Sequence, residues 1–196
     1  MIELIAFDLI GVLITQKHII RDNLMKIEKH AHYSKIKENY KLLKVGKTTE
    51  EQFWKTSRSK FEKLEKLFLD SLHIDPEYYE YIKPLKEKYK LAIISDIPEL
   101  WGKYLTKKYR FDETFNIILM SGAIGDTKEH KKIFKILIKK SGIEPMRIIF
   151  IDDEKENLKH ASDVKIKTVW FNIEKDNFKY KPDYTIKSLK EINKII

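Results

Sequence analysis

Side chains that can perform chemistry follow the apolar runs of this chain. Each run is short and is typical of a strand in a parallel sheet. The groups that come next are carboxylates, a hydroxyl and an ammonium: Asp8, Ser95 with Asp96, Asp152 with Asp153, and Lys128 in the loop after 116–120. Because ligands of open α/β sheets bind outside the carboxyl ends of the strands, we expect these groups to converge on one edge of one sheet.

The predicted cluster has the composition of a phosphoryl-transfer site. Carboxylates within several Å of one another repel, so a buried cluster of them needs a cation. Hard oxygen ligands suit Mg²⁺, which typically takes one or two carboxylates together with substrate phosphate. Asp8 could then attack phosphorus and form an aspartyl-phosphate. Lys128 would neutralise the transferring group, and Ser95 would hydrogen-bond its oxygens.

The elements that must position these groups follow from the hydrophobic pattern. Apolar runs alternate with segments whose apolar residues recur at helical spacing, which predicts a parallel α/β sheet covered on both faces by helices. We expect strands at 2–7, 90–95, 116–120, 147–151, 166–171 and 184–186. We expect helices at 77–88, 98–109, 129–141 and 154–162, and a terminal helix capped by Ser188.

Residues 17–72 interrupt this alternation with a helical segment of about 55 residues. Apolar residues recur at helical spacing on both sides of Gly46, which breaks the segment, at 20, 24, 27 and 31 and at 53, 61, 64 and 68. Thr49 is a predicted N-cap, followed by Glu50 and Glu51 in the first turn, where the helix dipole favours acids. Trp54 could line the substrate pocket or pack in the core of this segment, and we favour the core.

Length and composition indicate one globular domain or a domain with a modest insertion. The chain has 196 residues, 42% of them hydrophobic, which is enough for a core and excludes wholesale disorder. It contains no cysteine, which excludes a disulfide scaffold and a thiolate zinc site. Its apolar runs are too short to span a bilayer, and the N-terminal run is typical of a buried strand, not of a secretion signal. We therefore expect a cytoplasmic protein with no membrane partner.

The charge of the chain leaves nucleic-acid binding to be considered. The net charge is +9, and residues 17–72 contain 14 basic and 8 acidic residues. Clustered lysines can bind a phosphate backbone through counterion release. The chain nevertheless has no arginine-rich run, RNA-reading aromatic motif or zinc knuckle. We therefore attribute the excess to a lysine-rich proteome and do not expect nucleic acid as a partner.

Four segments, taken in order, resemble the motifs of the haloacid dehalogenase-like (HAD) superfamily. Its first motif, a strand followed by Asp-x-Asp-Gly, is similar to Phe7–Leu13. The second motif ends a hydrophobic strand in Ser or Thr and the third is a lysine, similar to Ser95 and Lys128. The fourth, a hydrophobic residue followed by two aspartates and a helix-borne Asn, is similar to Ile151–Asp153 with Asn157. Each motif is weak alone, but together they extend the resemblance over essentially the whole chain.

The resemblance implies catalytic and substrate-binding roles for four residues. Asp8 would be the nucleophile, and Ser95 and Lys128 would hold the phosphoryl group. Asp96 would lie beside them in the substrate site. The implied activity is the hydrolysis of a small phosphorylated metabolite.

The resemblance also implies a Mg²⁺ site. Its ligands would be the carboxylate of Asp8, the main-chain carbonyl of Ile10 and the carboxylate of Asp152, helped by Asp153.

Two domains follow from the same resemblance. Residues 1–15 and 77–196 would form a Rossmann-like core with a parallel sheet, and residues 16–76 a small α-helical cap of the C1 type inserted after the first strand. Specificity in capped enzymes lies in the insertion, which also excludes water during the chemistry. Because this insertion is lysine-rich, we expect it to attract a small anionic substrate.

One position departs from the pattern of the family. Its phosphatases usually carry a second aspartate two residues after the nucleophile, where it acts as general acid and then base, and this chain has Ile10 there. General acid–base catalysis contributes about 10²–10⁴-fold in rate. We therefore favour a slow or substrate-assisted phosphatase.

Two alternatives to the phosphatase follow from Ile10. The first is a catalytically weak or inactive protein that binds a phosphorylated ligand, a nucleic acid or a partner protein. The retained Asp8, Lys128 and Asp152 argue against it, because an inactive protein is free to lose them. The second is a haloacid dehalogenase-type hydrolase, in which a halide leaves without a proton. The Asp152-Asp153 pair and Asp96, where dehalogenases usually have Asn, argue against it.

Overall fold

A parallel sheet of six strands forms the centre of the protein, in the order β3-β2-β1-β4-β5-β6. Its computed structural model describes residues 1–28, 32–55, 61–172, 174–175 and 177–196. The strands are β1 (Leu4–Phe7), β2 (Lys90–Ser95), β3 (Ile117–Met120), β4 (Ile148–Asp152), β5 (Lys167–Phe171) and β6 (Tyr184–Ile186). The predicted α/β fold and all six predicted strands are therefore confirmed, with ends that differ by at most two residues.

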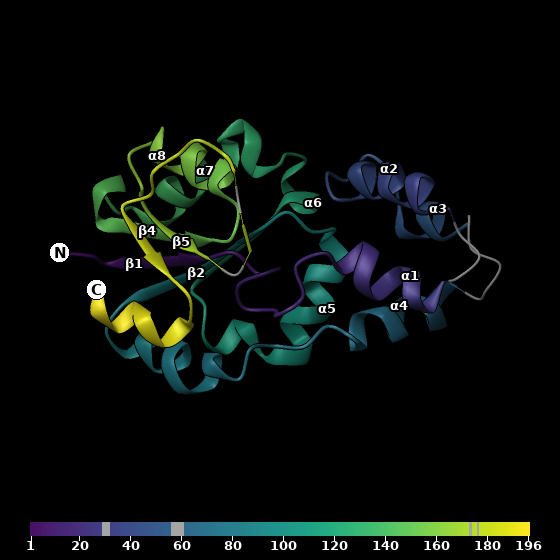
Figure 1. Ribbon diagram of the computed structural model, residues 1–196, viewed down its shortest axis with the longest axis horizontal. Coiled ribbons are helices and arrows are strands. Elements are labelled where there is room, and N and C mark those ends of the chain that lie inside the picture. The colour runs from purple at the N-terminus through teal and green to yellow at the C-terminus, as the bar shows by residue number, and fades with distance from the viewer. Residues whose placement is uncertain (29–31, 56–60, 173, 176) are drawn as a thin grey trace.

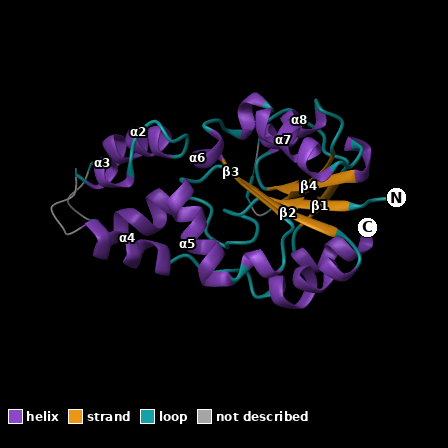
Figure 2. Cartoon of the chain, turned by 180° about the vertical axis from the view of Figure 1, so that it is seen from behind, coloured by secondary structure: helices purple, strands orange, loops and turns teal. Residues whose placement is uncertain are grey.

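Helices cover both faces of the sheet because its central strands are apolar on both sides (Figures 1 and 2). In β1, Leu4 and Ala6 belong to the cluster under α7 (Lys132–Ser141) and α8 (Lys155–Ser162), whereas Ile5 and Phe7 belong to the cluster on the opposite face. That second face is covered by α5 (Glu99–Tyr109) and by short helical turns. The turns of the molecule outside 17–72 are Tyr78–Ile82, Lys83–Glu87, Phe111–Glu113, α6 (Ser121–Ile124), Lys128–His130, Pro145–Arg147 and Leu189–Lys194.

Three of the predicted helices differ from the structure in kind or in length. The segment at 77–88 is a π-helical turn followed by a 3₁₀ turn, and Pro84, which lacks an N–H, stands at the start of the second turn. α7 begins at Lys132, not at 129, because Lys131 has a positive φ of 63°. The terminal helix is a 3₁₀ turn, and the side chain of Ser188 makes no capping hydrogen bond to it.

The segment between β1 and the turn at Tyr78 is helical, as predicted. It contains a π-helical turn (Ile20–Leu24), α1 (Met25–Ile27), α2 (Tyr33–Leu43), α3 (Glu50–Trp54) and α4 (Phe61–Asp70). Gly46 breaks it with a φ of 68°, and the hydroxyl of Thr49 accepts a hydrogen bond from Gln52 N at 3.2 Å at the start of α3. Ala31, which the helical spacing included, lies outside the described residues. Figure 1 shows α1–α4 beyond the carboxyl ends of β1 and β2.

The two chain segments that enter and leave this helical region lie side by side. Thr15 N donates to His73 O at 3.0 Å, and Asp75 N donates to Leu13 O at 2.8 Å. Ile14 and Ile74 form an antiparallel bridge between them. The region at residues 16–73 is therefore tied to the sheet through a narrow two-stranded connection.

An aromatic cluster joins the helical region to α5. The ring of Trp101 lies 4.9 Å from that of Phe68 and 5.6 Å from that of Phe53, centroid to centroid. Trp54 is also fully buried in this cluster, so its predicted place in the core is confirmed. These residues belong to the same hydrophobic cluster as Ile5 and Phe7 of the sheet, so apolar packing is continuous between the two regions.

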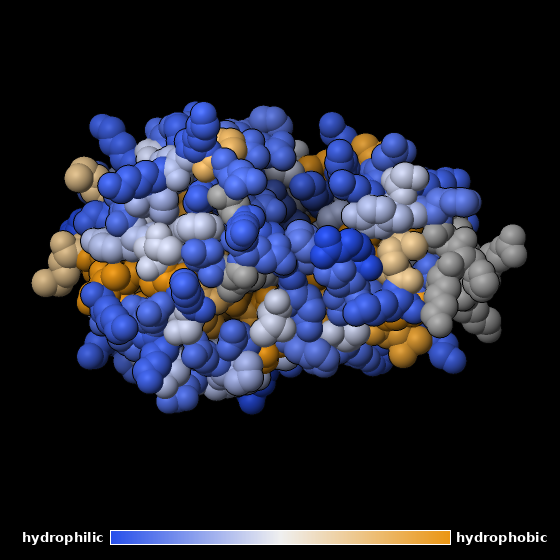
Figure 3. Space-filling model, viewed as in Figure 1, coloured by the Kyte–Doolittle hydropathy of each residue, from blue (hydrophilic) through white to orange (hydrophobic). Residues whose placement is uncertain are grey.

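The face of the protein seen in Figure 3 is mostly hydrophilic. Figure 3 shows one face on which polar side chains predominate and apolar ones form small groups. Within the described parts of the chain, no helix has the length and apolar character needed to traverse a lipid bilayer.

Candidate active site

The strand order places the predicted residues at one edge of the sheet. β1 lies between β2 and β4, with Phe7 in register with Ile93 on one side and Ile151 on the other. Asp8 N continues the ladder by donating to Ile151 O at 2.8 Å. The residues at the carboxyl ends of these three strands therefore lie beside one another.

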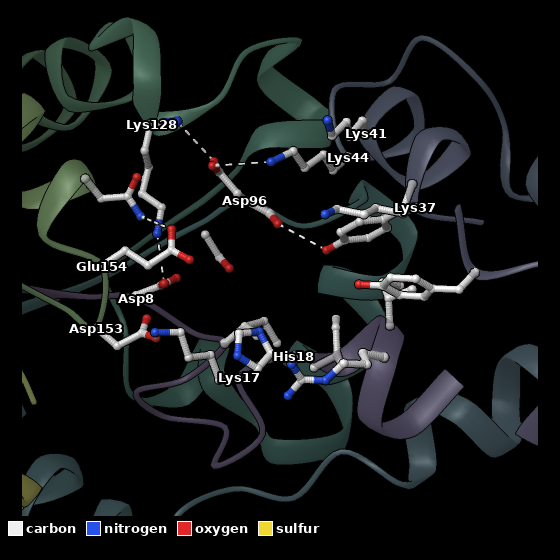
Figure 4. A pocket seen from close by; sticks show the side chains of 18 residues that line it. Asp8, Lys17, His18, Lys37, Lys41, Lys44, Asp96, Lys128, Asp153 and Glu154 are labelled. Atoms are coloured by element: carbon white, nitrogen blue, oxygen red, sulfur yellow. Dashed lines mark hydrogen bonds and ion pairs between the residues drawn. The ribbon is translucent and has the colours of Figure 1, made fainter. Parts of the chain in front are cut away.

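Lys128 links two of the carboxylates. Its Nζ lies 2.8 Å from Asp8 Oδ2, as Figure 4 shows. The same Nζ lies 2.6 Å from Asp152 Oδ2. The lysine side chain is 2% exposed, and those of Asp8 and Asp152 are 7% and 0% exposed. Because the three groups are removed from water, their charges interact far more strongly than on the surface.

Neighbouring polar groups hold Lys128 and Asp152 in place. Asp96 Oδ1 accepts a hydrogen bond from Lys128 N at 3.1 Å. Asn157 Nδ2 donates to both carboxylate oxygens of Asp152 at 3.2 Å, and Glu154 N donates to Asp152 Oδ1 at 2.7 Å. The helix-borne Asn157 thus orients the acid that fixes the lysine.

Asp153 is held by a different lysine and by close packing. Lys17 Nζ lies 2.9 Å from Asp153 Oδ2. A Cβ added to Gly11 would lie 2.8 Å from Asp153 Cγ, and Gly11 has a φ of 90°. The loop after β1 therefore needs glycine at this position both for its backbone conformation and for the space that Asp153 occupies.

The site carries more negative than positive charge, and the pKa values show it. Burial raises the pKa of Asp8 to about 7, a rise that Lys128 opposes and Asp153 increases. Burial likewise raises the pKa of Asp152, Asp153 and Asp96. For Lys128, burial alone would lower the pKa, but Asp152 and Asp8 raise it well above its usual range. The ammonium therefore stays charged, while the carboxylates lack full compensation.

The donor set of the site fits a hard divalent cation. Oxygens of Asp8, Asp152 and Asp153 lie within 4.8 Å of one another, and all three residues are buried. Carboxylate oxygens are the ligands that Mg²⁺ prefers, and such an ion would supply the missing positive charge.

The hydroxyl of Ser95 lies in the same site and makes no hydrogen bond to any residue that the structure describes. The side chain of Ser95 is 1% exposed. A buried hydroxyl without a partner is costly, so it indicates a group that arrives with a ligand.

One cavity of about 300 Å³ joins the site to the helical region. Of the predicted site residues, Asp8, Ile10, Ser95, Asp96, Lys128 and Asp153 line it, and Asp152 lies buried behind Lys128. The structure thus brings together every site residue that the sequence predicted.

Several lining residues were not predicted from the sequence. They come from the loop after β1, from the π-helical turn Ile20–Leu24, and from α2 and its C-cap: Lys17, His18, Arg21, Tyr33, Lys37, Tyr40, Lys41 and Lys44. The four-residue spacing of Lys37 and Lys41 was the available signal. In a chain with 39 lysines and arginines, however, such spacing does not distinguish a cavity wall from a solvated helix face.

Comparison with known proteins decides the family. Residues 5–171 match the family of haloacid dehalogenase-like hydrolases. The chain belongs to this family. The resemblance stated for its four motifs is therefore confirmed, and Asp8, Ser95, Lys128 and the Asp152-Asp153 pair occupy one site of a haloacid dehalogenase-like protein.

A curated relative carries a phosphatase name. Glyceraldehyde 3-phosphate phosphatase from Pyrococcus furiosus is 34% identical over 89 residues, which are 44% of this chain and 36% of that protein. The match thus spans about a third of the length of this relative.

Solved structures with similar folds include one named as a phosphatase and one named as a dehalogenase. A HAD family enzyme from Bacteroides thetaiotaomicron, in complex with magnesium and inorganic phosphate, has a TM-score of 0.72 and 24% identity over 90% of this chain and 98% of that one. A HAD phosphatase from Thermococcus onnurineus has a TM-score of 0.73 and 21% identity over 99% and 97% of the chains. A 2-haloacid dehalogenase from Pseudomonas syringae also scores 0.73, with 15% identity over 99% and 97%. These likenesses show the fold.

Proposed function

We propose that this protein hydrolyses small phosphomonoesters and that Asp8 is the nucleophile. The observation that carries the proposal is the buried group of Asp8, Lys128, Asp152 and Asp153 beside the unpartnered hydroxyl of Ser95 in one cavity. A phosphoryl group has the negative charge and the acceptor oxygens that Lys128 and Ser95 require.

Asp8, Asp152 and Asp153 would hold Mg²⁺, with the main-chain carbonyl of Ile10 as a further ligand. The buried and undercompensated charge of the three carboxylates supports this assignment. When bound, the ion would neutralise charge on the phosphoryl oxygens and on the carboxylates.

In the reaction, a carboxylate oxygen of Asp8 forms a bond to phosphorus as the bond from phosphorus to the leaving oxygen breaks. The leaving alkoxide takes a proton and departs as an alcohol. Lys128 and Ser95 hold the phosphoryl oxygens during this step, and Asp96 positions Lys128 through its main-chain N–H. Water then attacks the aspartyl-phosphate, which releases phosphate and restores Asp8.

Residues 16–76 would act as a cap over this cavity. Support comes from the narrow connection at Thr15 and His73 and from the residues of α2 that line the cavity opposite Asp8. We divide the chain accordingly into a core of 1–15 and 77–196 and a cap of 16–76. A cap excludes water from the phosphoryl group during the chemistry.

Hydrolysis of p-nitrophenyl phosphate, with and without MgCl₂, tests the proposal. We expect activity that requires Mg²⁺ and that falls roughly 10³-fold or more in Asp8→Asn, because Asn cannot form the acyl-phosphate. Asp112→Asn is the matched control, since Asp112 is an exposed acid outside the cavity.

Other outcomes identify the alternatives. Equal activity of wild type and Asp8→Asn would contradict the assignment of Asp8 as the nucleophile. Release of chloride from 2-chloropropionate by wild type, without phosphate release from any phosphomonoester, would instead indicate a dehalogenase. Phosphate binding in calorimetry with no turnover of either compound would indicate the inactive, ligand-binding alternative.

A further inference from the structure

α2 presents a basic stripe to the cavity. Tyr33, Lys37, Tyr40, Lys41 and Lys44 all line it, at the three- and four-residue spacing that puts side chains on one helix face. Ile36 and Leu43 on the other side of α2 are buried in the hydrophobic core, which fixes the rotation of the helix. Figure 4 shows Lys37, Lys41 and Lys44 across the cavity from Asp8 and Lys128.

Two of these lysines lack a carboxylate partner. Within the described residues, no acidic oxygen lies within 4.0 Å of Lys37 Nζ or Lys41 Nζ, whereas Lys44 Nζ lies 4.0 Å from Asp96 Oδ2. Lysines on the neighbouring helices behave differently. Lys66 of α4 pairs with Asp70 at 2.5 Å and Lys103 of α5 with Glu99 at 2.6 Å, each one helical turn away.

The cations near Asp8 are already engaged, so they do not account for the stripe. Lys128 is shared by Asp8 and Asp152, and Lys17 is paired with Asp153. Lys37 and Lys41 therefore place positive charge that is not paired with a described carboxylate at the opposite end of the cavity.

We propose that the substrate is a phosphomonoester with a second anionic group, a carboxylate or a phosphate, at the end remote from the ester, and that Lys37 and Lys41 bind this group. The proposal rests on the proposed function and names its substrate class. The phosphoryl group lies against Asp8, Ser95 and Lys128, and the distal anion lies against α2. Both ends of a small metabolite are then held by opposite charge across one cavity of about 300 Å³.

Matched substrates test the distal site. 3-Phosphoglycerate and glycerol 3-phosphate differ in one group, a carboxylate in place of a hydroxymethyl, and fructose 1,6-bisphosphate and fructose 6-phosphate differ in one phosphate. We expect wild type to prefer the member of a pair that has the distal anion by about tenfold in kcat/KM, mainly through KM. The pair that shows the larger preference identifies the distal group as carboxylate or phosphate.

The double variant Lys37→Gln/Lys41→Gln should remove most of this preference. Lys35→Gln is the matched control, because Lys35 is an exposed lysine of the same helix that does not line the cavity. It loses the same kind of charge but should keep the wild-type preference. A preference that depends on a distal ion pair should also shrink as salt concentration rises.

Calorimetry with the Asp8→Asn variant and MgCl₂ measures how tightly each compound binds without being hydrolysed. This measurement separates the distal-site proposal from the proposed function. Tighter binding of 3-phosphoglycerate than of glycerol 3-phosphate, weakened by the double variant, would support the distal site even if wild type hydrolysed neither compound. The proposal is overturned if both members of each pair bind and react alike, or if the double variant and Lys35→Gln lower the preference equally.

A separate observation concerns His18. Its Nε2 lies 3.3 Å from Glu174 Oε2, and it is the one imidazole, among the described residues, that lines the cavity with Asp8 and Ile10. Figure 4 shows its ring at the cavity beside Lys17. Position 10, where phosphatases of the family usually carry an acid, cannot exchange a proton in this chain.

We infer that His18 is the general acid of the reaction. As an imidazolium, it donates the Nδ1 proton to the leaving oxygen while Glu174 accepts from Nε2 and stabilises the cation. The proton of the attacking water later returns to Nδ1. The other charged groups nearby are Lys17, 3.9 Å from Glu174, and the Arg21–Asp22 pair, in which Arg21 Nε lies 2.6 Å from Asp22 Oδ1.

Leaving-group dependence tests this assignment. His18→Asn should lower kcat for glycerol 3-phosphate about 10²-fold and for p-nitrophenyl phosphate far less, because p-nitrophenolate departs without a proton. His73→Asn, an exposed histidine outside the cavity, is the control. Ile10→Asp added to His18→Asn should restore activity on glycerol 3-phosphate, and equal losses on both substrates without this rescue would overturn the assignment.

Discussion

At the scale of single residues, the site depends on two lysines that hold different acids. Lys128 binds Asp8 and Asp152, and Lys17 binds Asp153. Truncation of a buried ion-pair partner costs far more than truncation of an exposed one, because it leaves an uncompensated charge. The consequences of substitution in this site should therefore be large even where no bond to substrate is lost.

Ile10→Asp should raise the turnover of alkyl phosphomonoesters. It supplies a carboxyl group in the cavity that holds Asp8, but because His18 is the inferred general acid of the wild type, the gain should stay well below the roughly 10²–10⁴-fold that general acid–base catalysis contributes. The gain should be smaller on p-nitrophenyl phosphate, and steady-state kinetics on both substrates measure the difference. Ile10→Asn, which has a similar shape without a proton to give, is the control, and an equal gain in it would attribute the effect to polarity or packing.

Gly11→Ala should destabilise the protein and disturb Asp153. The new Cβ would meet the carboxylate at 2.8 Å, and the φ of 90° is unfavourable for alanine. We expect a loss of about 1–3 kcal/mol in the free energy of unfolding, measured by urea denaturation. Gly125→Ala is the matched control, because Gly125 has a φ of 75° but nothing within 4 Å of the added Cβ. A similar loss in both variants would show that backbone strain alone accounts for it.

At the scale of elements, α5 joins the helical region to the sheet. Its Trp101 is fully buried, stacks on Tyr40 of α2 at 5.7 Å, and donates its indole N–H to Glu65 Oε2 of α4 at 2.9 Å. One residue of the sheet-covering layer therefore contacts α2 and α4, two helices of the region beyond the strands. The position of α2 over the cavity depends on this packing.

Trp101→Ala should cost about 3–5 kcal/mol in the free energy of unfolding, the range for a large buried aromatic. It should also raise KM, because α2 loses the ring on which Tyr40 stacks. Leu100→Ala is the control on the same helix, since Leu100 is 51% exposed and should cost within about 0.5 kcal/mol. Urea unfolding and steady-state kinetics measure both effects, and an unchanged KM in a folded Trp101→Ala would contradict the role in positioning α2.

At the scale of the whole molecule, the buried acids oppose folding. The folded pKa of Asp8, about 7, lies above its ordinary value of 3.8. A raised folded pKa means that the stability this group contributes is present below about pH 4 and is lost as the pH rises through about 7. In the absence of a bound cation, ionisation of the buried Asp8 carboxylate should therefore lower the free energy of unfolding as the pH rises toward neutral.

Asp8→Asn in EDTA should be more stable than wild type at pH 8, by on the order of 2 kcal/mol, and the difference should vanish toward pH 4. The free energy of unfolding from urea denaturation at several pH values measures this. MgCl₂ should stabilise wild type at pH 8 more than the variant, because the ion compensates the ionised carboxylate. A variant less stable than wild type at pH 8 would show that the Asp8–Lys128 pair outweighs the cost of burying Asp8.

Local sequence patterns are informative within the helical region but fail at the starts of two helices outside it. Gly46 and Thr49 mark its middle correctly, because a positive φ and a capping box are local properties of a few residues. Lys131 breaks the start of α7 with a left-handed backbone that no local pattern signals, since lysine rarely adopts it. The predicted N-cap at Ser188 is also wrong. Serine is a favourable N-cap residue, but the turn that follows it is 3₁₀ and its side chain makes no capping hydrogen bond.

The strands, their parallel arrangement and the convergence of Asp8, Ser95, Lys128 and Asp152 could be predicted from the amino-acid sequence, because apolar periodicity and the topology of parallel strands are encoded along the chain. Which acid each lysine binds, and which face of α2 lines the cavity, depends instead on how distant segments pack in three dimensions. The sequence around a lysine does not show which acid it will contact. The fold buries Lys128 beside Asp8 and places Lys17 beside Asp153. The lysines of α2 line the cavity because Ile36 and Leu43, on the other side of this helix, pack into the core.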